Sequence, residues 1–315
     1  MSVFLDSDDI FALGPVAAVA TLQDALRAGL DPDDDVPRAV IPLSKGQALI
    51  MPSEAGQWFG VKVATVAPDN PALGLERINA TYLLHDAETL CPVAILDGVA
   101  LTTLRTPAVS VAACLDLLGA LADESGDGLR LVVFGVGPQG EGHVRTIRAH
   151  APLIDVSVVT RRGGLVPAWA DRHLAADDAA LADYVRVADV VVTATSAREP
   201  VFDGHLVRDG AVVIAVGSHE PSARELDGAL LGRATVVVES RDVALREAGD
   251  VVLAAAEGLL DPSSLVSLAD LFGVLGQGNG RAIANSRPTV VKTTGMAWED
   301  LVVAVAAYER WCARA

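Results

Sequence analysis

The sequence is poor in cysteine, in aromatic residues and in positive charge. Its 315 residues include only three cysteines, which lie far apart, and 4% aromatic residues. Widely spaced cysteines exclude a disulfide framework and show no metal-ligand spacing, so we expect a reducing, cytoplasmic location and no metal site. The 24 lysines and arginines are outnumbered by 41 acidic residues, which gives a net charge of −17. Nucleic acid and anionic membranes would repel such a chain, so neither is expected as a partner.

Long uninterrupted apolar runs and an N-terminal signal-peptide pattern are also missing. The sequence therefore predicts neither a membrane span nor a secretory leader. Hydrophobic residues nevertheless make up 51% of the chain. This composition is typical of a globular protein, and the length allows two domains, each with its own core.

The first 112 residues have the pattern of a small α+β domain. Residues 7–29 predict one helix. Short strands, separated by turn residues, predict an antiparallel meander over 38–43, 48–51, 60–67, 77–85 and 93–96. A long apolar helix over 106–121 is expected to connect this domain to the next.

From residue 129 onward, apolar strands alternate with helical segments. The expected strands cover residues 129–134, 155–160, 189–194, 211–216, 235–239 and 289–292. Continuous Val/Ile runs of this kind favour a parallel sheet covered on both faces. Residues 243–287 look mostly helical and connecting, and a last helix over 298–311 should return to the first domain. We predict an α/β chain in which a Rossmann domain, residues 113–293, is joined to a strand-rich α+β domain, residues 1–112 with 294–315.

A glycine motif of the form G-x-G-x-x-G follows the first of these parallel strands. It consists of Gly135, Gly137 and Gly140, and a helix follows it directly. The first glycine permits a tight turn, the second lets the backbone approach a pyrophosphate, and the third lets the helix pack on the strand. The helix N-terminus adds free N–H groups and a positive dipole end. The motif predicts dinucleotide binding, although a plain strand–helix turn remains the alternative.

The end of the second strand of this domain bears on the choice of cofactor. An acidic residue there would bind the ribose 2′-hydroxyl of NAD, but Thr160 is followed by Arg161 and Arg162. Guanidinium groups pair with phosphate, so these residues favour the 2′-phosphate of NADP(H), with NAD(H) also possible. The alternative is a solvated basic turn.

A second set of cations lies in the first domain, at Arg38, Lys62 and Arg105. Lys62 is flanked by Val61 and Val63 in a predicted strand, so its side chain points to the face opposite the valines. Either it extends toward solvent or it serves a binding site.

The chain resembles the ornithine cyclodeaminase/mu-crystallin family over nearly its whole length. The matching motifs are Met51-Pro52, Gly60-Val-Lys62, Leu96-Asp97-Gly98, Leu101-Thr-x-x-Arg105-Thr106, Gly135-x-Gly137-x-Gln139, Val216-Gly217, Pro221-x-x-Arg224-Glu225-Leu226 and Lys292-Thr-x-Gly295-Met-Ala-x-Glu299-Asp300. The resemblance implies that the first domain binds substrate and pairs across a homodimer. It places Arg38, Lys62 and Arg105 where a substrate carboxylate is bound. The cofactor positions are expected at Thr106, Gly135, Gly137, Gln139, Gly140, Thr160, Arg161, Arg162, Thr193, Thr195, Val216, Gly217, Ser218, Lys292 and Gly295.

Two positions depart from the ornithine cyclodeaminase pattern. His219 stands where those enzymes carry an aspartate, and Leu49 stands where they carry a glutamate. Both carboxylates that would meet a diamine are therefore replaced, which argues against ornithine as the substrate. His219 is either a general acid or a polar residue that lines the pocket.

The sequence thus predicts an NAD(P)H-dependent oxidoreductase of small α-imino or α-amino acids, of the ketimine or Δ1-pyrroline-2-carboxylate reductase type. Lys62, His219 or a held water is the expected proton donor. Ornithine cyclodeaminase with bound NAD and alanine dehydrogenase remain as alternatives. A non-catalytic protein that binds NADPH and a ligand, like mu-crystallin, is the alternative from a different class.

Overall fold

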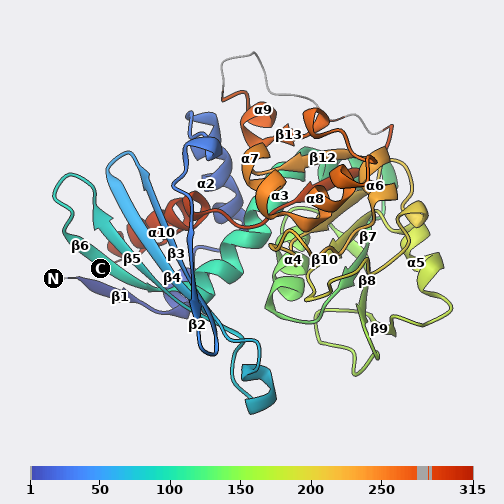
Figure 1. Cartoon of the computed structure of the whole chain (residues 1–315), viewed down its shortest axis with the longest axis horizontal. Helices are drawn as coiled ribbons and strands as arrows, with labels where there is room; N and C mark the ends of the chain where they lie inside the picture. Colours follow the sequence, from blue (N-terminus) through green and yellow to red (C-terminus); the bar gives the residue numbers. More distant parts are fainter. Residues whose placement is uncertain (1, 275–282, 284–285, 315) are drawn as a thin grey trace. The chain divides into compact units, whose positions relative to one another are not determined.

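A computed structural model describes residues 2–274, 283 and 286–314, and the chain forms two compact units (Figure 1). Unit 1 comprises Met1–Val109 and Met296–Ala315, and unit 2 comprises Ser110–Gly295. The sequence placed the two divisions at 112/113 and 293/294, within three residues of those observed.

Unit 1 is built on a six-stranded sheet with the order β1-β6-β5-β4-β3-β2. The strands are β1 (Val3–Leu5), β2 (Ala39–Leu43), β3 (Gly46–Ala55), β4 (Trp58–Val66), β5 (Ile78–Asp86) and β6 (Pro92–Asp97). Strands β2 to β6 form the antiparallel meander, while β1 pairs with β6 in parallel. The C-terminal helix α10 (Ala297–Cys312) packs on β3, β4 and α2, so both ends of the chain contribute to one core.

The N-terminal region differs from its predicted form in two ways. The single helix expected over residues 7–29 is divided into α1 (Ser7–Phe11) and α2 (Pro15–Arg27). Gly14 separates them with a φ of 77°, a conformation that a helix interior does not contain, and Pro15 then occupies the first turn of α2. Strand β1 was not predicted, because three residues carry too little periodicity to be recognised.

Helix α3 (Gly98–Ser125) runs from unit 1 into unit 2 and begins eight residues earlier than expected. The Asp97 side chain accepts hydrogen bonds from Val99 N at 2.9 Å and Ala100 N at 3.0 Å, so it caps the helix start. Pro107 is accommodated in the interior. Contrary to the expectation from sequence, this helix is long and apolar enough to span a membrane, but 72% of its most apolar window is buried, as in a core helix.

Unit 2 contains an eight-stranded parallel sheet with the order β13-β12-β14-β11-β10-β7-β8-β9 (Figure 1). Its strands are β7 (Leu129–Phe134), β8 (Leu153–Thr160), β9 (Arg172–Ala175), β10 (Val190–Thr193), β11 (Val212–Ala215), β12 (Thr235–Val238), β13 (Val266–Ser267) and β14 (Thr289–Lys292). The chain order reverses between β7 and β10, as in a doubly wound nucleotide-binding fold. The predicted Rossmann fold is confirmed; the sequence missed only the edge strands β9 and β13.

The helices of unit 2 connect these parallel strands. They are α4 (Pro138–Arg148), α5 (Leu181–Val187), α6 (Gly228–Arg233), α7 (Arg241–Glu247), α8 (Gly249–Ala256) and α9 (Leu268–Phe272). The segment expected to be mostly helical over 243–287 contains parts of α7, α8 and α9 interrupted by β13, and some of it lies outside the described residues.

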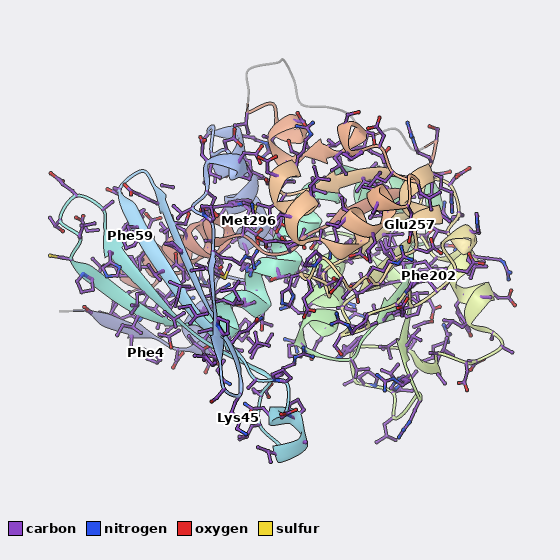
Figure 2. All side chains as sticks on the ribbon, in the orientation of Figure 1. Phe4, Lys45, Phe59, Phe202, Glu257 and Met296 are labelled. Carbon is purple, nitrogen blue, oxygen red and sulfur yellow. The ribbon has the colours of Figure 1, made fainter. Side chains whose placement is uncertain are left out.

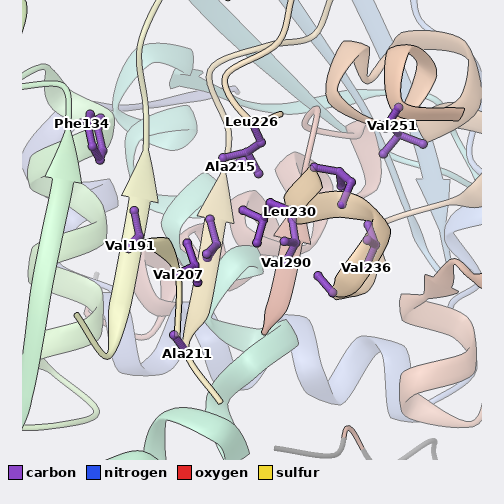
Figure 3. Close-up of a cluster of buried hydrophobic side chains, with 14 of the residues drawn as sticks. Phe134, Val191, Val207, Ala211, Ala215, Leu226, Leu230, Val236, Val251 and Val290 are labelled. Atoms are coloured by element: carbon purple, nitrogen blue, oxygen red, sulfur yellow. The ribbon is translucent and has the colours of Figure 1, made fainter. Parts of the chain in front are cut away.

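The core of unit 2 forms where strand side chains meet the covering helices. Val191, Ala215 and Val290 lie on one face of the sheet and pack with Leu230 of α6 (Figure 3). Phe202, labelled in Figure 2, stacks on Phe134 with 5.2 Å between ring centroids. The core thus fixes the strands whose carboxyl ends carry the predicted cofactor residues.

Candidate active site

Unit 1 contains a buried cluster of two cations and two carboxylates. Lys62 Nζ lies 2.6 Å from Asp300 Oδ2, and Arg105 Nε lies 3.1 Å from Asp300 Oδ1. Arg105 Nη1 also lies 2.5 Å from Glu299 Oε2. The side chains are 5% exposed or less, so the four charges are neutralised mainly by one another and only slightly by solvent.

The cluster is assembled from three elements that are far apart in sequence. Lys62 lies on β4, opposite Met51 of β3 and Tyr82 of β5, while Arg105 lies on α3. The two carboxylates are in the first turn of α10. Glu299 also accepts a hydrogen bond from Met296 N at 3.1 Å, so the cap of α10 holds the partner of Arg105 in place.

Burial makes Lys62 a weaker base than an ordinary lysine. Desolvation and the nearby Arg105 lower its pKa from 10.5 to about 8, against the opposing effects of Asp300 and Glu299. The structure gives the ammonium group two hydrogen-bond acceptors, Asp300 and Thr102 Oγ1 at 3.4 Å. Since an ammonium has three N–H bonds, one is left for a further acceptor. A lysine of this pKa can release and recover a proton near neutral pH.

The structure brings together Lys62 and Arg105 of the predicted cation set. Lys62 and Arg105 share the Asp300 carboxylate, and Arg105 does not use Asp97, the acidic neighbour in sequence, which caps α3 instead. Arg38 is half-buried and lies directly before β2. The structure therefore shows a paired ionic cluster where the sequence predicted three cations ready for a substrate carboxylate.

The glycine turn of unit 2 has the geometry that a dinucleotide needs. Gly135 has a φ of 112°, and a Cβ there would lie 2.4 Å from the Ala194 carbonyl oxygen. A Cβ on Gly140 would lie 2.2 Å from the Gly135 carbonyl oxygen, so helix α4 packs closely on the turn. A Cβ on Gly137, the N-cap of α4, would meet no protein atom within 4 Å. The second glycine thus borders open space at a helix N-terminus, which fits a pyrophosphate.

A buried histidine of α4 connects this helix to α3. His143 Nδ1 lies 2.7 Å from the Gln139 carbonyl oxygen, and its Nε2 lies 3.2 Å from Ser110 Oγ on α3. Because a carbonyl only accepts, Nδ1 donates and Nε2 accepts. Burial lowers the pKa of His143 to about 4, so the ring is neutral at physiological pH.

The turn after β8 presents the two predicted arginines to solvent. Arg161 and Arg162 are both exposed. The Thr160 hydroxyl lies 2.8 Å from His173 Nε2 and 3.2 Å from the Gly163 carbonyl oxygen. Thr160 therefore shapes the turn through partners within the protein, and the arginines remain available for a phosphate.

A buried carboxylate links the ends of β10 and β11. Glu225 accepts hydrogen bonds from Thr193 Oγ1 at 3.0 Å, from the backbone and hydroxyl of Thr195 at 2.7 Å each, and from Gly217 N at 2.7 Å. Thr193 is fully buried. Thr193 was predicted at a cofactor position, and in the structure its side chain faces Glu225 inside the unit.

Lys292, another predicted cofactor residue, is also fully buried. Its ammonium donates to the Ser218 carbonyl at 2.6 Å and the Ala215 carbonyl at 3.3 Å, and it lies 3.2 Å from Asp250 Oδ2. Its side chain is 0% exposed. Lys292 cannot reach a ligand at the surface, so we correct its role to holding the loop after β11. Ser218 Oγ donates to the Ala223 carbonyl and closes the same loop.

The remaining predicted residues occupy loops or helix positions near the ends of strands. Val216, Gly217 and the half-buried His219 follow β11. Gly295 follows β14 with a φ of 78° and donates its N–H to Glu239 Oε1 at 2.9 Å, while Thr106 is buried within α3. Over residues 2–274, 283 and 286–314, no group of three or more His, Cys, Asp or Glu residues is placed to hold a metal ion.

Sequence analysis missed the acidic half of both buried networks. Glu225, Glu299 and Asp300 were noticed only as parts of family motifs, and Asp250 was not noticed at all. Their sequence signal was weak, because a lone acidic residue beside apolar residues is far more often solvated than buried.

The chain matches the model of the ornithine cyclodeaminase/mu-crystallin family over residues 17–315. It is 34% identical to a Delta(1)-pyrroline-2-carboxylate reductase of Bacillus thuringiensis, over 84% of this chain and 82% of the relative. It is 31% identical to the ketimine reductase mu-crystallin of Mus musculus, over 87% and 84%. The solved Delta(1)-pyrroline-2-carboxylate reductase of Thermococcus litoralis, in complex with NADH and L-proline, superposes with a TM-score of 0.79 at 26% identity, over 99% and 98% of the two chains. This protein belongs to the ornithine cyclodeaminase/mu-crystallin family.

Proposed function

We propose that this protein is an NAD(P)H-dependent reductase of small α-imino acids, with Δ1-pyrroline-2-carboxylate or a related cyclic ketimine as substrate. The observation that carries the proposal is the buried Lys62, whose pKa is lowered to about 8 beside Arg105 and Asp300. A reductase of C=N bonds must deliver a proton to nitrogen, and a lysine that titrates near neutral pH can do so. The relatives named as reductases of such substrates support the same conclusion.

The residues of unit 1 would bind and protonate the substrate. Arg105 and Arg38 would orient its carboxylate, because a guanidinium offers a planar pair of donors. Lys62 would pass its proton to the imino nitrogen and regain it from solvent. His219, a residue of unit 2, is the second candidate proton donor. Asp300 would help to keep Lys62 protonated.

The residues of unit 2 would hold a nicotinamide dinucleotide, which supplies hydride when bound. Gly135, Gly137 and Gly140 would seat the pyrophosphate at the N-terminus of α4. We infer a preference for NADP(H), because the exposed Arg161 and Arg162 can pair with a 2′-phosphate. The Thermococcus litoralis enzyme, whose structure contains NADH, supports NAD(H) as the alternative cofactor.

We also propose that the protein is a homodimer in the cytoplasm. Every residue of the edge strand β2 is exposed, including Val40, Ile41 and Leu43. An exposed apolar edge strand favours pairing with another chain, and a second copy would cover it. The three cysteines are free, which fits a reducing compartment. Light scattering that shows a monomer at micromolar concentration would reject the dimer.

The activity is tested by following oxidation of NADPH and NADH with a panel of substrates. The panel contains Δ1-pyrroline-2-carboxylate, its six-membered homologue, and pyruvate with ammonia. Ornithine with NAD serves as the contrasting reaction. We expect rapid reduction of the cyclic imines and little reaction with ornithine, since Leu49 and His219 replace the carboxylates that a diamine needs. Rapid release of ammonia from ornithine, with cyclic imines inert, would refute the proposal.

A further inference from the structure

Three buried ionisable side chains lie near the carboxyl ends of the central strands of unit 2. They are Glu225 and Asp250, which are 0% exposed, and Lys292, which is 1% exposed. They connect β10, β11 and β14, which are neighbours in the sheet. Neither sequence analysis nor the proposed function assigns a chemical role to the two carboxylates.

The hydrogen bonds that Glu225 accepts favour its ionised form, whereas its burial does not. Each carboxylate oxygen accepts two hydrogen bonds, from Thr195 N and Oγ1 on one side and from Thr193 Oγ1 and Gly217 N on the other. A protonated carboxyl would have to direct its own O–H at one of these donors. Burial raises the pKa of Glu225 above its usual value, although Lys292 and the hydrogen bonds from Thr195 act in the opposite direction.

Asp250 and Lys292 form a pair that leaves Glu225 without a counter-charge of its own. Asp250 Oδ1 accepts the backbone N–H groups of Glu225 and Leu226 at 2.7 and 2.8 Å, and its Oδ2 lies 3.2 Å from Lys292 Nζ. Two carboxylates and one ammonium sum to a single negative charge. A further buried carboxylate, Glu239, follows β12 on the far side of β14 and adds to the negative field.

The position of this charge relative to the cofactor follows from the strand order and rests on the proposed function. In a doubly wound sheet the dinucleotide crosses the switch point, here between β7 and β10. The glycine turn and the arginine turn serve the pyrophosphate and the adenosine half, on the β7 and β8 side. The nicotinamide half then falls to the loops after β10 and β11. Glu225 binds directly to these loops, at Thr195 and Gly217.

The contact between these loops allows no side chain at Gly217. A Cβ there would lie 2.2 Å from the Thr195 carbonyl oxygen and 2.5 Å from Glu225 Oε1. The carboxylate is therefore packed directly against the backbone that would border the nicotinamide.

We propose that the negative charge of the Glu225–Asp250–Lys292 cluster makes unit 2 bind oxidised nicotinamide cofactor more strongly, relative to reduced cofactor, than it otherwise would. The oxidised ring carries a positive charge, and the reduced ring is neutral. When a C=N bond is reduced, a hydride with two electrons goes to the carbon and a proton goes to the nitrogen, and loss of the hydride would leave a positive charge on the nicotinamide ring. A fixed negative charge bound to the loops that would border that ring would stabilise this charge as it develops. The cluster would thus hold the loops after β10 and β11 in position and also assist hydride donation.

Two nearly isosteric variants test the charge separately from the shape. Glu225→Gln removes one negative charge but turns an amide N–H₂ toward existing donors. Asp250→Asn removes one negative charge while Oδ1 can still accept both backbone N–H groups. The dissociation constants of NADP⁺ and NADPH are measured by calorimetry for the wild type and each variant. In both variants we expect the ratio of the NADP⁺ constant to the NADPH constant to rise about fivefold, from loss of one unit charge acting through a partly buried medium.

Two control variants separate this effect from a structural one. Glu225→Asp keeps the charge but shortens the side chain, so both affinities should fall while their ratio stays unchanged. Asp183→Asn removes an exposed carboxylate of α5 that pairs with Arg186, and it should change neither constant. Melting temperatures establish which variants are folded, and Asp250→Asn alone decides the question if Glu225→Gln does not fold.

The outcomes distinguish this inference from the proposed function. Equal changes in both constants for Glu225→Gln and Asp250→Asn would mean that the cluster only maintains the fold, and the inference would be overturned. A wild-type protein that binds neither NADP⁺ nor NADPH, and neither NAD⁺ nor NADH, would instead refute the proposed function.

Discussion

Replacing Asp300 with asparagine should lower the pH at which imine reduction loses half of its rate. In the wild type, burial and Arg105 lower the pKa of Lys62 to about 8, while Asp300 raises it through its charge and its hydrogen bond. Asp300→Asn removes the opposing charge and leaves the two lowering effects in place. A charge-assisted hydrogen bond contributes roughly 1.5–3 kcal/mol. At 1.36 kcal/mol per pKa unit, its loss should lower the pKa by about one to two units.

The assay is the pH dependence of kcat/KM for reduction of a cyclic imino acid, which reports groups of the free enzyme. Because the proton donor must be charged, the wild-type rate should fall as the pH rises through about 8, and the variant should lose activity roughly one to two units lower. Asp24→Asn, an exposed carboxylate of unit 1, is the matched control and should leave the profile unchanged. A midpoint that stays in place or moves upward in a folded Asp300→Asn protein would show that Lys62 is not the group that titrates.

Three further predictions follow from the buried and exposed charges. Arg105→Ala should abolish turnover and lower the free energy of unfolding by about 3–5 kcal/mol, because two buried carboxylates lose their partner. A denaturation curve like that of the wild type would contradict the predicted loss of stability. The double variant Arg161→Ala with Arg162→Ala should weaken NADPH binding by at least about tenfold and leave NADH binding unchanged, which calorimetry can measure. Equal losses of affinity for NADPH and NADH would reject a contact between these arginines and the 2′-phosphate. Burial lowers the pKa of His143 from 6.5 to about 4, so between these pH values the unfolded chain binds a proton that the native protein does not bind, and the free energy of unfolding should fall by up to about 3 kcal/mol. In urea titrations, His143→Gln should make the free energy of unfolding less dependent on pH in this range. An unchanged pH dependence in the variant would argue against this role of His143.

Sequence alone determined the parts of the protein that depend on local pattern. The strand, glycine turn and helix around Gly135 are encoded within a few residues, because only glycine permits the positive φ and the close approach of α4. The parallel strands of unit 2 were visible as apolar runs, and the meander of unit 1 as short strands between turns. Local pattern failed where the signal was ambiguous. The sequence predicted that this helix starts at residue 106, whereas Asp97 caps it nine residues earlier.

Only the tertiary structure decided how the charged residues are used. Lys62 and Asp300 are 238 positions apart in the chain, and Arg105 and Glu299 are 194 apart. No local pattern shows that such residues meet, so the sequence predicted free cations where the fold forms a paired cluster. Likewise, Thr193 and Lys292 were expected to bind cofactor, and the fold buries both beneath the loops. The reason is energetic: a buried charge or hydroxyl must find a partner within the protein, and which partner lies within reach depends on how the strands and helices pack.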